Sequence, residues 1–359
     1  MSSPRDVDVV VIGAGQAGLS AAYHLARQGF APGRGSVVLD ADAAPGGAWQ
    51  HRWRSLTLAT THRVHELPGL PFTPASEDLP AADAVPAYFA EYERRFGLDV
   101  RRPVRVSAVR RTGDGRFLVE ADVGTWRARG VVNATGTWTR PFVPRYPGQE
   151  TFRGRQLHTV EYRGAAEFAG RAVVVVGGGA SAVQLLGEIA PVARTTWVTR
   201  RPPVFREGPF GEEEGRAAVA RVEAAVRAGR MPGSVVGVTG LVVTPWVRRA
   251  LDDGVLTRLP VFDRITPDGV AWDDGRFVAA DVILWATGFR AAVGHLAPLR
   301  LRTRDGVIPV EGTSAVGEPR LQLVGYGPSA STIGANRAGR TAAVTLRRLL
   351  ADGGLARSA

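Results

Sequence analysis

Two segments of the chain share one order of apolar, small and polar residues. In each, a short run of β-branched residues leads into a cluster of glycines, and apolar residues at helical spacing follow. The segments are residues 7–29, VDVVVIGAGQAGLSAAYHLARQG, and residues 171–190, RAVVVVGGGASAVQLLGEIA. This order predicts a strand, a tight turn and a helix, the opening of a parallel βαβ unit. Because the second glycine cluster begins 164 residues after the first, the pattern indicates two nucleotide-binding domains rather than a short repeat.

A third patterned stretch lies beyond the second glycine cluster. Residues 212–229, EEEGRAAVARVEAAVRAG, predict an amphipathic helix with Val219, Val222 and Val226 on one stripe. Its acidic beginning suits the positive N-terminal end of a helix. We expect a surface helix here, with a mobile lid as the alternative.

Composition excludes several kinds of chemistry. The 359 residues include no cysteine, which rules out disulfides, thiolate metal sites and dithiol redox centres in this chain. All 45 basic residues are arginine, so a lysine Schiff base is excluded as well. The net charge of +11 is scattered among acidic residues, and we therefore expect no nucleic-acid partner. Since no apolar run approaches the length of a membrane span or a secretory signal, the sequence predicts a cytoplasmic protein with no membrane partner.

The first glycine cluster has the features of a dinucleotide-binding turn. Gly13 permits the tight turn, Gly15 lets the backbone approach a pyrophosphate, and Gly18 lets the helix pack closely on the strand. The pyrophosphate then lies on the N–H groups at the start of the helix. Asp40 follows the strand-like run SVVL, 22 residues after Gly18, where an acidic residue accepts the ribose hydroxyls of an unphosphorylated adenosine.

The second cluster, GGGASA at residues 177–182, has alanine in the third position, which is an accepted variant. The strand that follows it ends in Arg200 and Arg201, where the first segment has Asp40. Arginine in this place suits the additional 2′-phosphate of NADP. Two dinucleotide sites in one chain indicate a relay in which a nicotinamide cofactor delivers electrons to a flavin.

The residues between the two clusters resemble those of the flavin-containing monooxygenases. Residues 152–162, FRGRQLHTVEY, are similar to that family's fingerprint F-x-G-x-x-x-H-x-x-x-Y/F. The turn at 46–49, GGAW, resembles the family's flavin-proximal turn, and Ala-Thr-Gly at 134–136 and at 286–288 resembles its two crossings between domains. Baeyer–Villiger enzymes typically carry Trp-Pro or Trp-Asp where this chain has Tyr162-Arg163, which favours heteroatom or carbon hydroxylation over ketone insertion.

This resemblance implies an α/β fold of the three-layer β/β/α type with two Rossmann-like dinucleotide-binding domains. An FAD-binding domain is expected at residues 1–145 and 285–359, and an NADPH-binding domain is expected to be inserted at residues 146–284. The expected FAD contacts are Gly13, Gly15, Gln16, Ala17, Gly18, Asp40, Gly47, Ala48, Trp49, Val106, Ala134, Thr135, Gly136, Gly288 and Gly325. The expected NADPH contacts are His158, Tyr162, Gly177, Gly179, Ala180, Ser181, Arg200, Arg201 and Thr287.

The activity that the resemblance implies is oxygenation of a small nucleophilic metabolite. NADPH reduces FAD, O2 adds to give a C4a-(hydro)peroxyflavin, and nitrogen or sulfur in the substrate takes one oxygen atom in a dry pocket. Two alternatives stay open. One is an oxidase or reductase that passes electrons from NADPH to an acceptor without inserting oxygen. The other is a non-catalytic sensor that binds FAD and NADP.

The chain departs from the family in the stretch that aligns with residues 59–62, where many members place an asparagine beside the flavin. This chain has Ala59-Thr60-Thr61-His62. Thr60 and Thr61 are candidate catalytic residues because a hydroxyl can donate in place of the amide, and His62 is a candidate substrate or flavin contact. No further ligands complete a set with His62 and His65, so the sequence predicts no metal site. It leaves the substrate and the oligomeric state open.

Overall fold

The computed structural model describes residues 3–61, 64–208, 212–230 and 240–352. The chain divides into two compact units, one comprising Met1–Thr137, Ala220–Pro232 and Ala291–Ala359, the other Trp138–Val219 and Gly233–Arg290. The first unit is therefore assembled from three separate stretches of sequence. Residues 220–232, which we expected in the inserted domain, group with the first unit.

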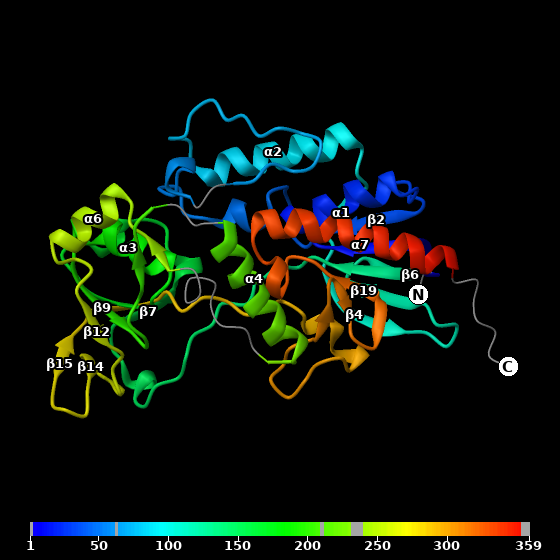
Figure 1. The fold of residues 1–359 in the computed structure, drawn as a ribbon. Helices are drawn as coiled ribbons and strands as arrows, with labels where there is room; N and C mark the ends of the chain where they lie inside the picture. The colour runs from blue at the N-terminus through cyan, green and yellow to red at the C-terminus, as the bar shows by residue number, and fades with distance from the viewer. Residues whose placement is uncertain (1–2, 62–63, 209–211, 231–239, 353–359) are drawn as a thin grey trace. The chain divides into compact units, whose positions relative to one another are not determined.

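A nine-stranded sheet forms the centre of the first unit (Figure 1). Five of its strands run parallel, in the order β19-β6-β1-β2-β3. Their bounds are β1 Arg5–Ile12, β2 Ser36–Leu39, β3 Val100–Arg101, β6 Gly124–Asn133 and β19 Glu318–Leu323. The hairpin of β4 (Val106–Arg111) and β5 (Phe117–Ala121) pairs antiparallel with the first half of β6. Two short strands, β17 (Val310–Glu311) and β18 (Ser314–Ala315), continue the sheet beyond β19.

The second half of β1, Val9–Ile12, is buried on both faces, and its side chains alternate between two layers. Val10 and Ile12 belong to a core cluster that also contains residues of β4 and β5. The opposite face is covered by helices, since Gly130, the register partner of Val9 in β6, abuts Leu346 of α7 (Thr332–Asp352). Helices α7 and α1 (Gln16–Arg27) lie side by side in Figure 1. The unit therefore has the expected β/β/α layers.

Two further helices belong wholly or partly to the first unit. Helix α2 spans Ala81–Phe96 and ends at Gly97, whose φ of +57° is the left-handed conformation that favours glycine. Helix α4 spans Glu212–Arg227, so the helix predicted at 212–229 is confirmed. Val226 is buried in the core cluster and Val222 packs against it, whereas the side chain of Val219 lies outside the described residues.

The second unit has a five-stranded parallel sheet in the order β12-β9-β8-β16-β7. The strands are β7 Arg155–His158, β8 Ala172–Val176, β9 Arg194–Thr199, β12 Arg258–Pro260 and β16 Val282–Trp285. Helix α3 (Ala180–Ile189) follows β8, and α6 spans Pro245–Asp252. The remaining strands are the pair β10 (Phe205–Arg206) and β11 (Leu241–Val242) and an antiparallel sheet of β13 (Arg264–Thr266), β14 (Gly269–Ala271) and β15 (Phe277–Ala279). The predicted α/β class is confirmed, because a parallel set of strands forms the core of the main sheet in each unit.

In the part of the chain that the structure describes, no helix has both the length and the apolar character that a membrane crossing demands.

Candidate functional site

The first glycine turn lies between β1 and α1, and its three glycines have different surroundings. Gly13 has a φ of +99°, and a Cβ there would stand 2.6 Å from the carbonyl oxygen of Ala134. A Cβ on Gly18 would stand 1.9 Å from the carbonyl oxygen of Gly13. Gly15 is extended, with φ −79° and ψ −170°, and its Cβ would meet nothing nearer than the Cα of Gly47 at 3.9 Å. Packing within the protein therefore explains Gly13 and Gly18, whereas a Cβ on Gly15 would have room and would make only an ordinary contact with Gly47.

Two more turns meet the beginning of α1. Gly47 has a φ of +50° and begins the 3-10 helix Gly47–His51, and a Cβ there would lie 2.8 Å from the Cα of Gly15. Gly325 follows β19 with a φ of +64°, and its Cβ would lie 3.2 Å from the Cβ of Ala17. The structure thus brings most of the expected FAD contacts together; those gathered here are Gly13, Gly15, Gln16, Ala17, Gly18, Gly47, Ala48, Trp49, Ala134 and Gly325.

Four other expected FAD contacts do not adjoin the start of α1 in the same way. Thr135 follows β6, and its hydroxyl donates to the carbonyl oxygen of Ala292 at 2.7 Å. Gly136, with a φ of +58°, has no neighbour within 4 Å of a Cβ position. Val106 lies on β4, where it packs against the core cluster, and Gly288 lies in the second unit.

Asp40 directly follows β2 and is only 6% exposed. Its Oδ2 accepts a hydrogen bond from Nε of Arg102 at 3.1 Å, and Arg102 also donates to both carboxylate oxygens of Glu93. Burial raises the pKa of the Asp40 carboxyl and is the largest cause, whereas the charge of Arg102 and its hydrogen bond oppose the rise. Arg102 therefore orients the carboxylate at the end of β2, and no local sequence pattern indicated this partner 62 residues away.

The second glycine turn repeats the local geometry of the first. Gly177 has a φ of +141°, and a Cβ there would stand 2.2 Å from the carbonyl oxygen of Ala286. The N–H of Ala286 donates to Val176 at 2.8 Å, the same bond that Ala134 makes at the first turn. Gly179 is extended at the start of α3, and its Cβ would meet no atom within 4 Å. Here a bare glycine faces open space at the beginning of a helix, directly before Ala180 and Ser181.

One difference separates the two turns. Ala182 occupies the position of Gly18 and is fully buried. The carbonyl oxygen of Gly177, whose counterpart abuts Gly18 in the first turn, accepts a hydrogen bond from Nε1 of Trp197 at 2.7 Å. The indole N–H thus satisfies the carbonyl oxygen of Gly177, whereas the corresponding carbonyl oxygen of Gly13 packs against Gly18 of α1.

Arg200 and Arg201 follow β9 as Asp40 follows β2. Both are exposed, and neither joins an ion pair with another residue that the structure describes. The hydroxyl of Thr199, at the end of β9, accepts from Nε of Arg258 at 2.7 Å. Three arginines therefore gather at this strand end, and Arg258 was not predicted because it arrives from the distant strand β12.

His158 and Tyr162 are both buried and bonded within the second unit. Nε2 of His158 lies 3.0 Å from the carbonyl oxygen of Gly288, and Nδ1 accepts from the N–H of Val160 at 3.3 Å. These partners place the proton on Nε2, and burial lowers the pKa of the ring, which is neutral at pH 7. The Tyr162 hydroxyl donates to Glu188 at 2.9 Å, and its pKa is raised, first of all by burial.

The Ala-Thr-Gly turn after β16 is held by these contacts and by one more. The hydroxyl of Thr287 donates to the carbonyl oxygen of Phe142, whose own N–H donates to Gly288 at 3.0 Å. His158, Thr287 and Gly288 therefore form one internally bonded cluster at the end of β16.

The stretch that departs from the family forms a 3-10 helix, Leu58–Thr60. The Thr60 hydroxyl donates to the carbonyl oxygen of Thr57 at 3.1 Å, and the Thr61 hydroxyl donates to that of Leu58 at 2.8 Å. Both hydroxyl protons are thus directed into the turn itself. His62 lies outside the described residues.

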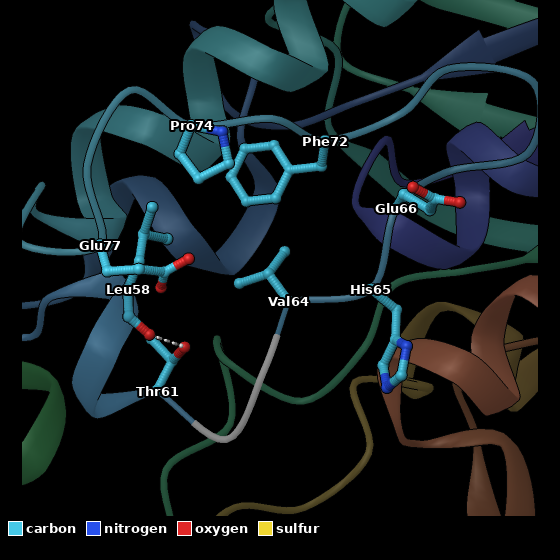
Figure 2. A pocket seen from close by; sticks show the side chains of 8 residues that line it. All are labelled: Leu58, Thr61, Val64, His65, Glu66, Phe72, Pro74 and Glu77. Carbon is cyan, nitrogen blue, oxygen red and sulfur yellow. Dashed lines mark hydrogen bonds between the residues drawn. The ribbon is translucent and has the colours of Figure 1, made fainter.

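A cavity of about 390 Å³ opens beside this turn in the first unit. Figure 2 shows the Glu77 carboxylate and the Val64 side chain directed into a space that Phe72 and Pro74 close on one side, whereas the His65 ring points away. The lining residues are Leu58, Thr61, Val64, His65, Glu66, Phe72, Pro74 and Glu77. The cavity therefore combines apolar surface with two carboxylates.

Within the described ranges, no three His, Cys, Asp or Glu side chains come together as a metal site would require.

Comparisons with known proteins agree with these features. Residues 10–210 match the family described as pyridine nucleotide-disulphide oxidoreductase. A mutant of the flavin monooxygenase from Stenotrophomonas maltophilia is 40% identical, with a TM-score of 0.83, over 96% of this chain and 99% of that chain.

Two curated relatives are similar over shorter stretches. The uncharacterized oxidoreductase CzcO of Bacillus velezensis is 30% identical over 200 residues, which are 55% of this chain and 56% of the relative. The indole-3-pyruvate monooxygenase YUCCA1 of Oryza sativa subsp. japonica is 34% identical over 187 residues, which are 49% of this chain and 43% of the relative. The chain thus matches about half the length of these curated relatives.

Proposed function

The chain belongs to the flavin monooxygenases, within the pyridine nucleotide-disulphide oxidoreductase family, and from this premise we propose that it oxygenates a small nucleophilic metabolite at nitrogen or sulfur, using FAD, NADPH and O2. The observation that carries the proposal is the pair of matching glycine turns. Each presents a glycine with no intramolecular reason to lack a side chain, at the start of a helix. Beside the first turn, β2 is followed by the acidic residue Asp40, and beside the second turn, β9 is followed by Arg200 and Arg201.

In this proposal the first turn holds FAD. Gly15 leaves room for the pyrophosphate, which would lie on the N–H groups at the start of α1. Asp40, oriented by Arg102, would accept the adenosine ribose hydroxyls. The turns at Gly47 and Gly325 would border the same site, because both approach the first residues of α1.

The second turn would hold NADPH. Gly179 offers the same bare backbone at the start of α3, and the guanidinium groups of Arg200 and Arg201 would bind the 2′-phosphate, beside Arg258, which is bonded to Thr199. His158 and Tyr162 would act on this site indirectly, because their polar atoms are bonded within the protein. We assign His158 to shaping the turn at Gly288 and Tyr162 to holding Glu188 of α3.

Bound FAD would take two electrons from NADPH and pass them to O2, so that one oxygen atom enters the substrate and the other leaves as water. The chain's own task is then to bind, orient and exclude water. We place the substrate in the cavity beside the Leu58–Thr60 turn, where Phe72, Pro74 and Val64 supply apolar contacts. Glu77 would favour a substrate with a positive charge close to its apolar part.

A second candidate function is an NADPH oxidase, which reduces O2 without oxygenating a substrate. One observation favours it: the hydroxyls of Thr60 and Thr61 donate into their own turn, so within the described part of this stretch, which ends at Thr61, neither threonine hydroxyl replaces the family's asparagine as a donor. Such an enzyme would release hydrogen peroxide in amounts equal to the NADPH consumed.

The test is a set of reactions with purified, FAD-loaded protein, NADPH and ¹⁸O₂, run with small amines and thioethers. The proposal expects ¹⁸O in the product, detected by mass, with less peroxide than NADPH oxidised. Peroxide equal to NADPH with every substrate would establish the oxidase instead. A protein that binds FAD but whose yellow colour does not bleach with NADPH under anaerobic conditions would contradict both candidates and indicate a sensor.

A further inference from the structure

A chain of side-chain amides joins α1, α7 and the loop that leads to the cavity. Nε2 of Gln16, the first residue of α1, donates to the carbonyl oxygen of His65 at 3.0 Å and to Oδ1 of Asn336 at 2.9 Å. Nδ2 of Asn336, on α7, donates to the carbonyl oxygen of Glu66 at 2.7 Å. Three elements that are far apart in the sequence are thus connected through two amides.

The two backbone carbonyls determine which way both amides face. A carbonyl oxygen only accepts, so the Asn336 NH₂ group must face Glu66, which turns its Oδ1 towards Gln16. The Gln16 NH₂ group therefore lies between two acceptors, Oδ1 of Asn336 and the carbonyl oxygen of His65. Rotating the Gln16 amide by 180° would place its oxygen against both acceptors. The hydrogen-bond network thus fixes the orientation of Oε1.

The oxygen fixed in this way has no hydrogen-bond partner within the described residues, although it is buried. Gln16 as a whole is only 9% exposed. Leaving such an acceptor unsatisfied is unfavourable, and most buried polar atoms in proteins are satisfied. Gln16 also directly follows Gly15, whose missing side chain opens the beginning of α1 to a ligand.

Asn336 is itself held in place from the side of α1. The Ser20 hydroxyl donates to its backbone carbonyl oxygen at 3.1 Å. A Cβ on Gly339, one turn further along α7, would lie 2.6 Å from Oγ of Ser20, so the two helices are in close contact here. The backbone that carries Asn336 is therefore fixed against the helix that carries Gln16.

We propose that Asn336 is a positioning residue for the flavin cofactor: it holds the Gln16 amide so that Oε1 accepts a hydrogen bond from an N–H or O–H group of bound FAD. This inference rests on the assignment of FAD to the first glycine turn. The shared chemistry is one donor of the cofactor, either N3–H of the flavin ring or a hydroxyl of the ribityl chain. Asn336 touches neither and acts through Gln16.

The experiment is a fluorescence titration of the full-length apoprotein with FAD, for wild type, Asn336→Ala, Gln16→Ala and the double variant. Each single substitution is expected to weaken FAD binding about fivefold to tenfold. Because Asn336 acts through Gln16, the double variant should bind FAD no more weakly than Gln16→Ala alone. Arg337→Gln, the exposed neighbour on α7, is the matched control and should bind FAD like the wild type.

A second ligand identifies the donor. An FAD analogue methylated at N3 lacks the ring N–H: if N3–H is the donor, wild type and Gln16→Ala bind the analogue equally, and if a hydroxyl is the donor, the difference between them persists. Additive effects in the double variant would overturn the inference and indicate a purely structural role for Asn336. Equal FAD affinity in all four proteins would overturn it as well and assign Oε1 to a bound water.

A variant that fails to fold and a wild type that binds no FAD have different meanings. If Asn336→Ala fails to fold, as judged by circular dichroism, Asn336→Ser replaces it under the same expectations. A folded wild-type apoprotein that takes up no FAD at all would contradict the proposed function itself, whereas tight FAD binding that no substitution alters would contradict this inference alone.

Discussion

Gly15 and Gly18 are three residues apart in one turn, yet alanine at the two positions should have opposite consequences. At Gly15 the backbone is extended and the nearest atom to a new Cβ is 3.9 Å away, so alanine fits. The apoprotein should keep its stability or gain about 0.4–1 kcal/mol, because alanine restricts the unfolded chain. The new methyl group would occupy the space assigned to the pyrophosphate, and we expect FAD to bind at least about tenfold more weakly, a loss of about 1.4 kcal/mol.

At Gly18 the same change should act on the fold. The Cβ would stand 1.9 Å from the carbonyl oxygen of Gly13, well inside any contact distance, so α1 must move away from β1. Such overpacking destabilises by about 1–3 kcal/mol. Urea unfolding of the two apoproteins, followed by FAD titration of Gly15→Ala, measures both effects. The reasoning is refuted if Gly15→Ala binds FAD like the wild type, or if Gly18→Ala is as stable as the wild type.

Replacing Arg200 and Arg201 together by serine should raise the KM for NADPH about tenfold or more while leaving that for NADH unchanged; equal effects on both nucleotides would contradict the 2′-phosphate assignment. Burial lowers the pKa of His295 from 6.5 to about 4, so the imidazole takes up a proton in the unfolded chain before it does so in the folded protein as the pH falls. The free energy of unfolding should therefore drop by up to about 3 kcal/mol between pH 6.5 and pH 4. A His295→Gln variant whose stability, measured by urea unfolding, falls equally steeply with pH would refute this. Glu77→Gln should lower kcat/KM about threefold for a thioether that carries an ammonium group but not for its uncharged analogue. Asp78→Asn, the adjacent exposed control, should leave kcat/KM unchanged for both substrates. A lower kcat/KM with both substrates in Glu77→Gln would contradict a role of Glu77 in recognising the positive charge.

The sequence was sufficient for the two glycine turns because each steric requirement there is local. Gly13, Gly15 and Gly18 lie within six residues, and the strand and helix that flank them are visible in the apolar pattern. The same locality made it possible to place Asp40 at the end of β2 and the two arginines at the end of β9.

Contacts between distant residues could not be predicted in this way. Arg102 orients Asp40 from 62 residues away, and Asn336 orients Gln16 from 320 residues away. His158 and Tyr162 matched a family fingerprint, but the fingerprint does not reveal that His158 is bonded to a backbone carbonyl and Tyr162 to Glu188. Which distant backbone group accepts a given hydrogen bond depends on the packing of elements, and residue type alone does not determine it.

The interleaved order of the two units has a consequence for synthesis on the ribosome. Every strand of the second unit's parallel sheet lies between residues 155 and 285, so this sheet can form as soon as that stretch has emerged. Strand β6 must wait for β19, whose Leu321 pairs with Val131, and for helix α7. A nascent chain that stops near residue 290 would therefore carry a complete second unit, whereas the sheet of the first unit would have an unpaired edge at β6. Chaperones shield this kind of intermediate from aggregation.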